Sequence, residues 1–207
     1  MDSIEFALEN YIKSGFFNAR SDTSSEYHFT ETDSGGESDL SLTVSGKHYC
    51  TMNYDKNNRP NFIFLKPDKK YGMLKCVDHF VIKQHNDKWD LYMFEFKTTV
   101  GFNTWNDIKG KFRASLLSIR ALCVYLGIEI DNVYAYTTYE TDKFKESQDT
   151  NPVLRKSLLG VTPYPDPEIE WNSGFVCLNT FDKVKFPHSP ILLKRNEKGV
   201  LCGEFSI

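Results

Sequence analysis

The feature that most constrains the fold is a pair of β-type runs at residues 75–84 and 89–100. Both runs are rich in Val, Ile, Phe and Tyr, and a polar stretch at residues 85–88 separates them. Branched and aromatic side chains favour strands, and a short polar stretch favours a turn. The pattern therefore predicts an antiparallel hairpin.

A long amphipathic segment follows at residues 104–126. Its apolar side chains recur at helical spacing: Trp105, Ile108, Phe112, Ile119, Cys123 and Leu126. This spacing predicts a helix with one buried face, which Asn103 or Thr104 caps and which ends at Gly127. Three basic residues lie beside the apolar stripe: Lys109, Arg113 and Arg120.

The N-terminal part of the chain has weaker patterns. Residues 2–19 have apolar side chains near helical spacing and predict an amphipathic helix. Residues 20–38 are rich in Ser, Thr and acids, which favours a loop or a mobile insertion. Residues 40–54 alternate around a central Gly46 and predict a hairpin, and residues 60–65 predict a short strand.

The C-terminal part is predicted to be rich in strands. Residues 130–140 read as a strand, and residues 141–172 are polar, contain proline and leave room for a short helix at 153–159. Apolar runs at 175–181 and within 189–205 predict further strands.

Taken together, these patterns predict an α/β fold over residues 1–207 in a single domain. Strands in succession followed by a helix and another strand favour a mixed sheet flanked by helices, with one crossover connection. The tail adds extra C-terminal strands.

Composition narrows the class of protein. With 25 basic and 28 acidic residues the net charge is −3, which argues against a globally basic nucleic-acid binder but permits a local basic groove. The five cysteines form no CxxC pair, which favours a reducing compartment and argues against a zinc ribbon or an iron–sulfur cluster. No signal peptide or apolar run near ~18 residues is evident, so we expect a cytoplasmic protein without a membrane span.

Three residues of the hairpin carry the chemistry. Asp78 interrupts an apolar strand, where a carboxylate is out of place unless it meets water or a metal. Glu95 and Lys97 are two residues apart in the next strand, so both point to one side. We therefore expect the three side chains to converge. Two carboxylates suit Mg²⁺, the Phe96 carbonyl is a further candidate ligand, and the lysine could orient a water molecule.

The segment from Asp78 to Glu95-Phe96-Lys97, followed by a long helix, resembles the active-site region of PD-(D/E)XK phosphodiesterases. The resemblance covers roughly residues 70–140, and Val77 stands where the motif has proline. It implies a restriction endonuclease-like core: a helix, a three-stranded antiparallel meander, a helix and a further strand. It also implies Mg²⁺- or Mn²⁺-dependent cleavage of a phosphodiester, with DNA favoured over RNA.

The resemblance implies a further metal ligand on the first helix, for which Glu9 is the first choice and Glu5 the reserve. On the long helix, Lys109, Arg113 and Arg120 could contact phosphates, with Arg113 as the first choice because it is nearest the site, although a solvated helix face explains these three equally well. Small proteins of this type are expected to act with a protein partner or as a homodimer.

Other interpretations stay open. Glu95 and Lys97 could be a solvated pair on a sheet, with Asp78 as a cross-strand partner of the lysine. The same fold could then serve as a catalytically inactive module that docks protein or nucleic acid. A third possibility is an interaction protein of another fold, with residues 141–207 as its contact surface.

The remaining motifs are weak or absent. Three tyrosines could stack bases, but ordinary strand packing explains them better: Tyr134, Tyr136 and Tyr139. The five histidines have no metal-binding spacing, and His79 should alternate to the face opposite Asp78. The sequence contains no phosphate-binding glycine motif and no nucleophile elbow.

Overall fold

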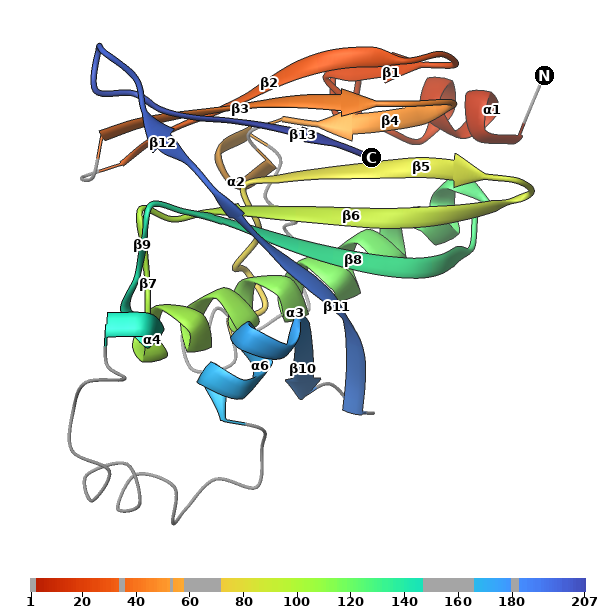
Figure 1. The fold of residues 1–207 in the computed structure, drawn as a ribbon. Coiled ribbons are helices and arrows are strands. Elements are labelled where there is room, and N and C mark those ends of the chain that lie inside the picture. The colour runs from red at the N-terminus through yellow and green to blue at the C-terminus, as the bar shows by residue number, and fades with distance from the viewer. Residues whose placement is uncertain (1–2, 34–35, 53, 58–71, 147–165, 180–182) are drawn as a thin grey trace.

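A computed structural model describes residues 3–33, 36–52, 54–57, 72–146, 166–179 and 183–207. Its largest element is a seven-stranded mixed sheet (Figure 1). In spatial order the strands are β1 (Ala19–Ser21), β4 (His48–Thr51), β5 (His79–His85), β6 (Lys88–Phe96), β8 (Ile130–Tyr139), β11 (Lys183–Leu192) and β10 (Phe175–Asn179). Strands β4, β5 and β6 form an antiparallel meander, and β8 and β11 continue the sheet in parallel with β6.

A second sheet has four strands. In spatial order they are β12 (Lys194–Arg195), β13 (Leu201–Ser206), β3 (Gly36–Val44) and β2 (Ser25–Asp33). A two-stranded ribbon pairs β7 (Thr99–Val100) with β9 (Thr141–Asp142). The described helices are α1 (Ser3–Asn10), α2 (Tyr54–Asn57), α3 (Phe102–Leu126), α4 (Lys143–Glu146) and α6 (Pro167–Ser173).

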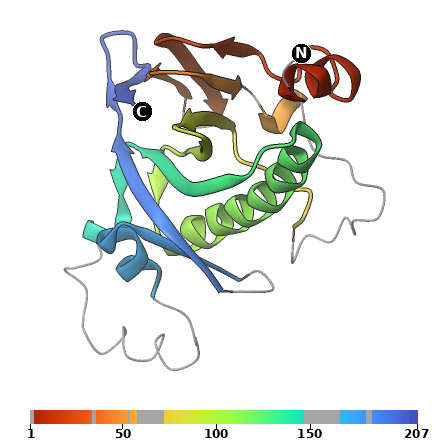
Figure 2. The ribbon, with the colours of Figure 1, turned by 90° about the vertical axis from the view of Figure 1, so that its right-hand side faces the viewer.

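The seven-stranded sheet is covered on both faces, which creates two apolar cores. Helix α3 crosses one face, and the four-stranded sheet lies over the other (Figures 1 and 2). Phe80 and Met93 pack in the core with α3, whereas Val81 and Phe94, their neighbours along the strands, pack in the core with the second sheet. The α/β class and the mixed sheet are confirmed, but the described helices flank the sheet on one face only.

Helix α3 confirms the predicted stripe, since all six of its apolar residues are buried. Its predicted cap is wrong. The N-cap is Gly101, whose carbonyl accepts from the Trp105 N–H at 2.8 Å, because the ribbon before it delivers an extended chain up to that residue. Gly127 ends the helix in the left-handed conformation, as expected. None of the described helices is long and apolar enough to cross a membrane.

Three predictions for the N-terminal part are wrong. The first helix stops at Asn10 rather than near residue 19. The polar segment 20–38 forms β1, β2 and the start of β3, because its polar side chains lie on an outer face while residues such as Phe29 point into the core. Residues 40–54 are not a hairpin, since β3 and β4 belong to different sheets.

Most of the other predicted strands are present in the structure. The hairpin of β5 and β6, the strand β8 and the C-terminal strands are confirmed. The segments 60–65 and 153–159 lie outside the described residues. Helix α6 was not predicted, although Asp166 accepts from the Glu168 N–H as its cap and Pro167 opens its first turn.

One buried histidine ties β11 to α3 and α6. The His188 ring lies 4.6 Å from the Trp105 ring and 5.2 Å from the Trp171 ring, and its Nε2 lies 3.0 Å from Thr137 Oγ1. Burial lowers the pKa of His188 to about 3. The folded protein therefore keeps this ring neutral where the unfolded chain would protonate it.

This depressed pKa predicts a pH-dependent stability. Only the unfolded chain binds a proton at His188. The stability that the neutral His188 ring contributes is therefore fully present above about pH 6.5 and is lost as pH falls toward about 3. From pH 7 to pH 5 we expect His188 to remove about 2 kcal/mol from the free energy of unfolding. Urea denaturation at both pH values measures this, with His188→Gln as the comparison. Equal losses in the variant and the wild type would contradict the prediction.

Candidate active site

The backbone around Asp78 is anchored from two elements. The Val77 N–H donates to Ser115 Oγ of α3 at 2.8 Å, and the Tyr54 N–H of α2 donates to the Asp78 carbonyl at 2.7 Å. In the β5–β6 register His79 pairs with Phe94, so the next position outward sets Asp78 opposite Glu95.

Glu95 is brought to the same point by strand alternation. It lies on the α3 side of β6, its side chain is 0% exposed, and Phe96 on the opposite side packs in the other core. The Phe96 N–H donates to Asp78 Oδ2 at 2.6 Å, which locks the two strand ends together. Lys97 Nζ lies 2.6 Å from Glu95 Oε1 and donates to the Phe96 carbonyl at 3.0 Å. The three predicted residues therefore converge.

Sequence reasoning missed a fourth member of this site. Lys111 of α3 places Nζ 2.6 Å from Glu95 Oε1 and 3.2 Å from Asp78 Oδ1, so one ammonium group spans both carboxylates. The position of Lys111 on the predicted helix could have indicated this role. At 100° per residue Lys111 lies about 40° from the buried Ser115, at the margin of the apolar stripe rather than on the solvent side.

The electrostatics of the site follow from burial. Burial, and after it the charge of Asp78, raises the pKa of Glu95 to about 7, against the opposing pull of Lys111 and Lys97. Burial alone would lower the pKa of Lys111, but the carboxylates of Glu95 and Asp78 outweigh burial and raise it. The two carboxylates and two ammonium groups thus form one network of ionic contacts.

The donor set fits a hard divalent cation. Asp78, Glu95 and the Phe96 carbonyl offer oxygen ligands, and Glu95 Oε2 is buried without a hydrogen-bond partner among the described residues. Within the same ranges, no group of three or more His, Cys, Asp or Glu side chains is arranged to hold a metal. Mg²⁺ does not require such a group, because it is usually held by one or two carboxylates together with water and substrate phosphate.

The first-helix acids are not part of this cluster. Glu5 and Glu9 are exposed on α1, and Ser3 of the same helix lies next to Gly127, at the C-terminal end of α3. Helix α1 sits toward the β5–β6 turn, whereas Asp78 lies at the other end of these strands (Figure 1). The structure therefore does not bring Glu9 to the predicted metal site.

The basic residues of α3 separate into different environments. Lys109 Nζ lies 2.8 Å from Oε2 of the buried Glu170, so it joins α3 to α6. Arg113 is two residues beyond Lys111 and so faces about 160° away from it around the helix. Arg120 is exposed and lies nine residues, or about 13.5 Å, beyond Lys111 along the helix axis. A phosphate-binding role for Arg113 and Arg120 stays a prediction.

The predicted strand aromatics pack against their neighbours. The Tyr134 ring stacks on Tyr92 at 5.0 Å, and the Tyr136 ring stacks on Phe94 at 4.9 Å. Tyr139 packs edge-on against Trp171. These contacts favour ordinary sheet packing over base stacking.

His79 is fully buried on the face of β5 opposite Asp78, as predicted. Its ring stacks on Phe29 of the second sheet at 4.4 Å. It is a packed residue of the inter-sheet core.

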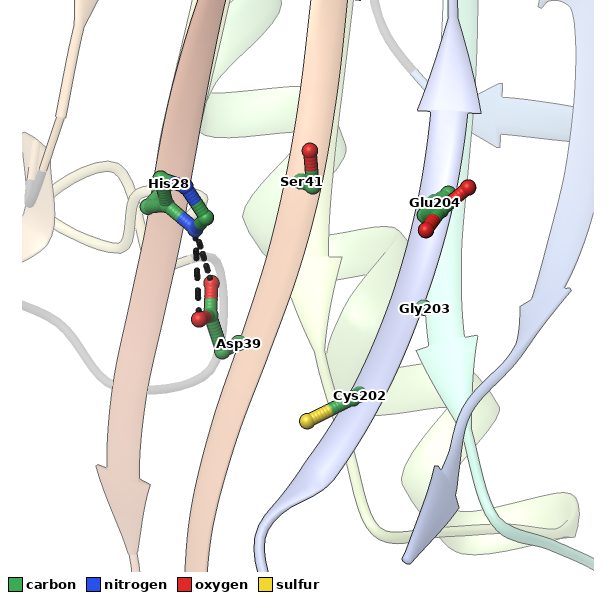
Figure 3. Close-up of a pocket in the computed structure, with 6 residues that line it drawn as sticks. All are labelled: His28, Asp39, Ser41, Cys202, Gly203 and Glu204. Atoms are coloured by element: carbon green, nitrogen blue, oxygen red, sulfur yellow. Dashed lines mark hydrogen bonds and ion pairs between the residues drawn. The ribbon is translucent and has the colours of Figure 1, made fainter. Parts of the chain in front are cut away.

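A hollow of about 500 Å³ lies on the outer face of the four-stranded sheet (Figure 3). His28 Nδ1 faces Asp39 Oδ1 there at 3.0 Å, but the Ser41 hydroxyl donates to Glu26 rather than to the imidazole. The hollow therefore lacks the serine–histidine bond that nucleophilic hydrolysis needs.

Comparisons with known proteins find no match. This holds for family models, for curated protein sequences and for solved structures. What the chain does must therefore be inferred from its own residues.

The network predicts strong energetic coupling between Lys111 and Glu95. Lys111→Met removes one counter-charge from a fully buried carboxylate, and we expect it to cost about 2–4 kcal/mol of the free energy of unfolding. Glu95→Gln with Lys111→Met should cost at least about 1 kcal/mol less than the two single changes added. Chemical denaturation of the four proteins measures the coupling, and additive costs would show that the pair is not energetically linked.

Proposed function

We propose that this chain is a Mg²⁺- or Mn²⁺-dependent nuclease of the PD-(D/E)XK type, acting on DNA. The observation that carries the proposal is the convergence of Asp78, Glu95 and the Phe96 carbonyl with two lysine ammonium groups. Lys97 and Lys111 are 25% and 20% exposed, so this otherwise buried cluster is open to solvent on its cationic side. A phosphodiester is an anion and would approach from that side.

The chain order supports the proposal. Helix α1 is followed by the antiparallel meander β4–β5–β6, then by α3, and then by β8 in parallel with β6. This is the order expected for a restriction endonuclease-like core, with the four-stranded sheet and the C-terminal strands as additions. Fold order alone is an analogy, so the weight rests on the side chains of the site.

Each residue of the site has a chemical role. Asp78 and Glu95, with the Phe96 carbonyl, would hold the cation. When bound there, Mg²⁺ would polarise the phosphoryl oxygen and make a coordinated water more acidic. Lys97 holds Nζ beside both Glu95 and the Phe96 carbonyl, where it can orient the attacking water. Lys111 can stabilise negative charge that develops on the phosphorus oxygens.

Partners follow from the charge of the chain. A net charge of −3 leaves little general attraction for nucleic acid, so a protein partner would supply additional basic surface, whereas a second copy of the chain would let a homodimer cut both strands. DNA is preferred over RNA on the family resemblance alone.

One observation favours the inactive binding module as the alternative. Two ammonium groups already balance the two carboxylates, and Glu9 does not join them. A protein of this fold that has lost its metal would keep such a neutral cluster for stability, and would use the same surface for docking only.

Cleavage of plasmid and single-stranded DNA with Mg²⁺ or Mn²⁺ separates these two functions. We expect the wild type to cut, and Asp78→Asn and Lys97→Ala to lose at least about a hundredfold in rate, because one weakens the cation site and the other removes the water-orienting ammonium.

Matched controls come from an exposed ion pair elsewhere on the protein. Lys88 Nζ lies 2.7 Å from Asp131 Oδ1 on the surface, so Asp131→Asn and Lys88→Ala make the same chemical changes away from the site. They should retain the wild-type rate. Absence of metal-dependent cleavage of both DNA and RNA by the folded wild type would reject the nuclease and leave the binding module.

A further inference from the structure

Resting on the proposed function, we infer that Lys111 is a resident counter-ion: it holds Asp78 and Glu95 together in the free protein, and a divalent cation must displace it. The displaced ammonium group is then the one that receives a phosphate of the substrate. Cation loading and substrate binding are thereby coupled through one side chain.

The geometry requires a displacement. Lys111 Nζ contacts Glu95 Oε1 at 2.6 Å and Asp78 Oδ1 at 3.2 Å, so it lies between the two carboxylates that a shared cation would bridge. Mg²⁺ needs its oxygen ligands at about 2.0–2.1 Å and in octahedral positions around it. One ammonium group and one divalent cation cannot both lie between the same two carboxylates.

Lys111 is the lysine that can leave. Lys97 directly follows β6 and also donates to the Phe96 carbonyl, so it stays on the strand that carries Glu95. Lys111 reaches the carboxylates from a different element, α3, on a long flexible stem. Its side chain is 20% exposed, so an outward rotation of the stem brings the ammonium group into water.

Burial explains why Lys111 does not leave by itself. The Glu95 side chain is 0% exposed and that of Asp78 is 7% exposed, so two carboxylates that lose a counter-charge cannot be rehydrated. An uncompensated buried charge is strongly unfavourable. Release of Lys111 is therefore an exchange of one cation for another.

The neighbourhood of Lys111 suits an anion after the exchange. Lys75 lies against Gly110, the residue before Lys111, and its Nζ is paired with the Asp107 carboxylate on the exposed side of α3. An outward Lys111 would join Lys75, so two ammonium groups would stand beside the one carboxylate of Asp107. This net positive charge fits the phosphodiester backbone, because sequence-independent contacts of lysine go to phosphate oxygens.

Binding of Mn²⁺ alone, followed by the loss of its free EPR signal, tests the exchange without any cleavage step. Lys111→Met should bind Mn²⁺ at least about tenfold more tightly than the wild type, because the competitor is gone. Lys111→Arg keeps the competing charge and should stay within about threefold of the wild type. Lys88→Met is the matched control for loss of a surface lysine away from the site, and should also stay within about threefold.

Asp78→Asn identifies where the ion binds, and should abolish the tight binding in the Lys111→Met background. Equal or weaker Mn²⁺ affinity of Lys111→Met, with binding still dependent on Asp78, would overturn the counter-ion inference and leave the nuclease proposal standing. No Asp78-dependent binding in any variant would overturn both. If Lys111→Met does not fold, Lys111→Gln takes its place, with circular dichroism as the check.

The coupling has its own readout. Excess phosphorothioate-linked ten-nucleotide thymidine single strand should raise the Mn²⁺ affinity of the wild type by at least about tenfold, since the released ammonium group gains a partner. The same strand should raise the affinity of Lys111→Met by a smaller factor, because only the direct contact of phosphate with the cation remains. The same measurement on Asp78→Asn gives the background, namely the Mn²⁺ that binds to the oligonucleotide rather than to the protein. Equal enhancement in the wild type and Lys111→Met would contradict the transfer of Lys111 to phosphate.

Discussion

Complete burial of the Glu95 carboxylate is the constraint on which the other parts of the site depend. A carboxylate without water must either be neutral or be matched by positive charge, and here burial and Asp78 push the pKa of Glu95 to about 7. Two ammonium groups from different elements compensate the charge of Glu95: Lys97 at the end of β6 and Lys111 on α3. The strand end and the helix are therefore fixed to each other by charge as well as by apolar packing.

The two-sided sheet makes this burial possible. Helix α3 closes one face over the Glu95 side of β6, and the four-stranded sheet closes the other face over Phe94 and Phe96. Within the described residues both faces of the hairpin are covered, and the hairpin meets solvent at its strand ends. Asp78 and Lys97 lie at those ends, so charged groups sit where a buried core meets solvent. Such borders suit chemistry on anions, because low-dielectric surroundings strengthen each ionic contact.

Strand alternation and turn formation can be read from neighbouring residues, and they predicted the part of the site that depends on the hairpin alone. The convergence of Asp78, Glu95 and Lys97 follows from strand alternation and a short turn, both of which are visible in the sequence. Lys111 could not be assigned in the same way, because its partners lie 16 and 33 residues away and depend on how α3 crosses the sheet. Glu9 lies away from the cluster for a related reason: the extent of the first helix and its position relative to the sheet are set by packing.

The polar N-terminal strands show a second limit of sequence patterns. The outer face of β2 and β3 is lined by Ser, Thr and acidic residues, so the composition of residues 20–38 hides the strand alternation beneath it. The buried side of that alternation, Phe29 and Leu40, is sparse but regular. A polar composition therefore predicted a loop where the chain forms strands with one fully solvated face. Pairing with neighbouring strands stabilises these strands although their local propensity is weak.

An anomalous difference map from crystals grown with Mn²⁺ tests the central claim most directly. The account predicts a peak within coordination distance of both the Asp78 and the Glu95 carboxylate, together with a Lys111 side chain that has turned away from both. A Lys111 ammonium group that remains between Asp78 and Glu95, with no peak at millimolar Mn²⁺, would contradict it. The cluster would then be a structural charge network in a protein that binds rather than cuts.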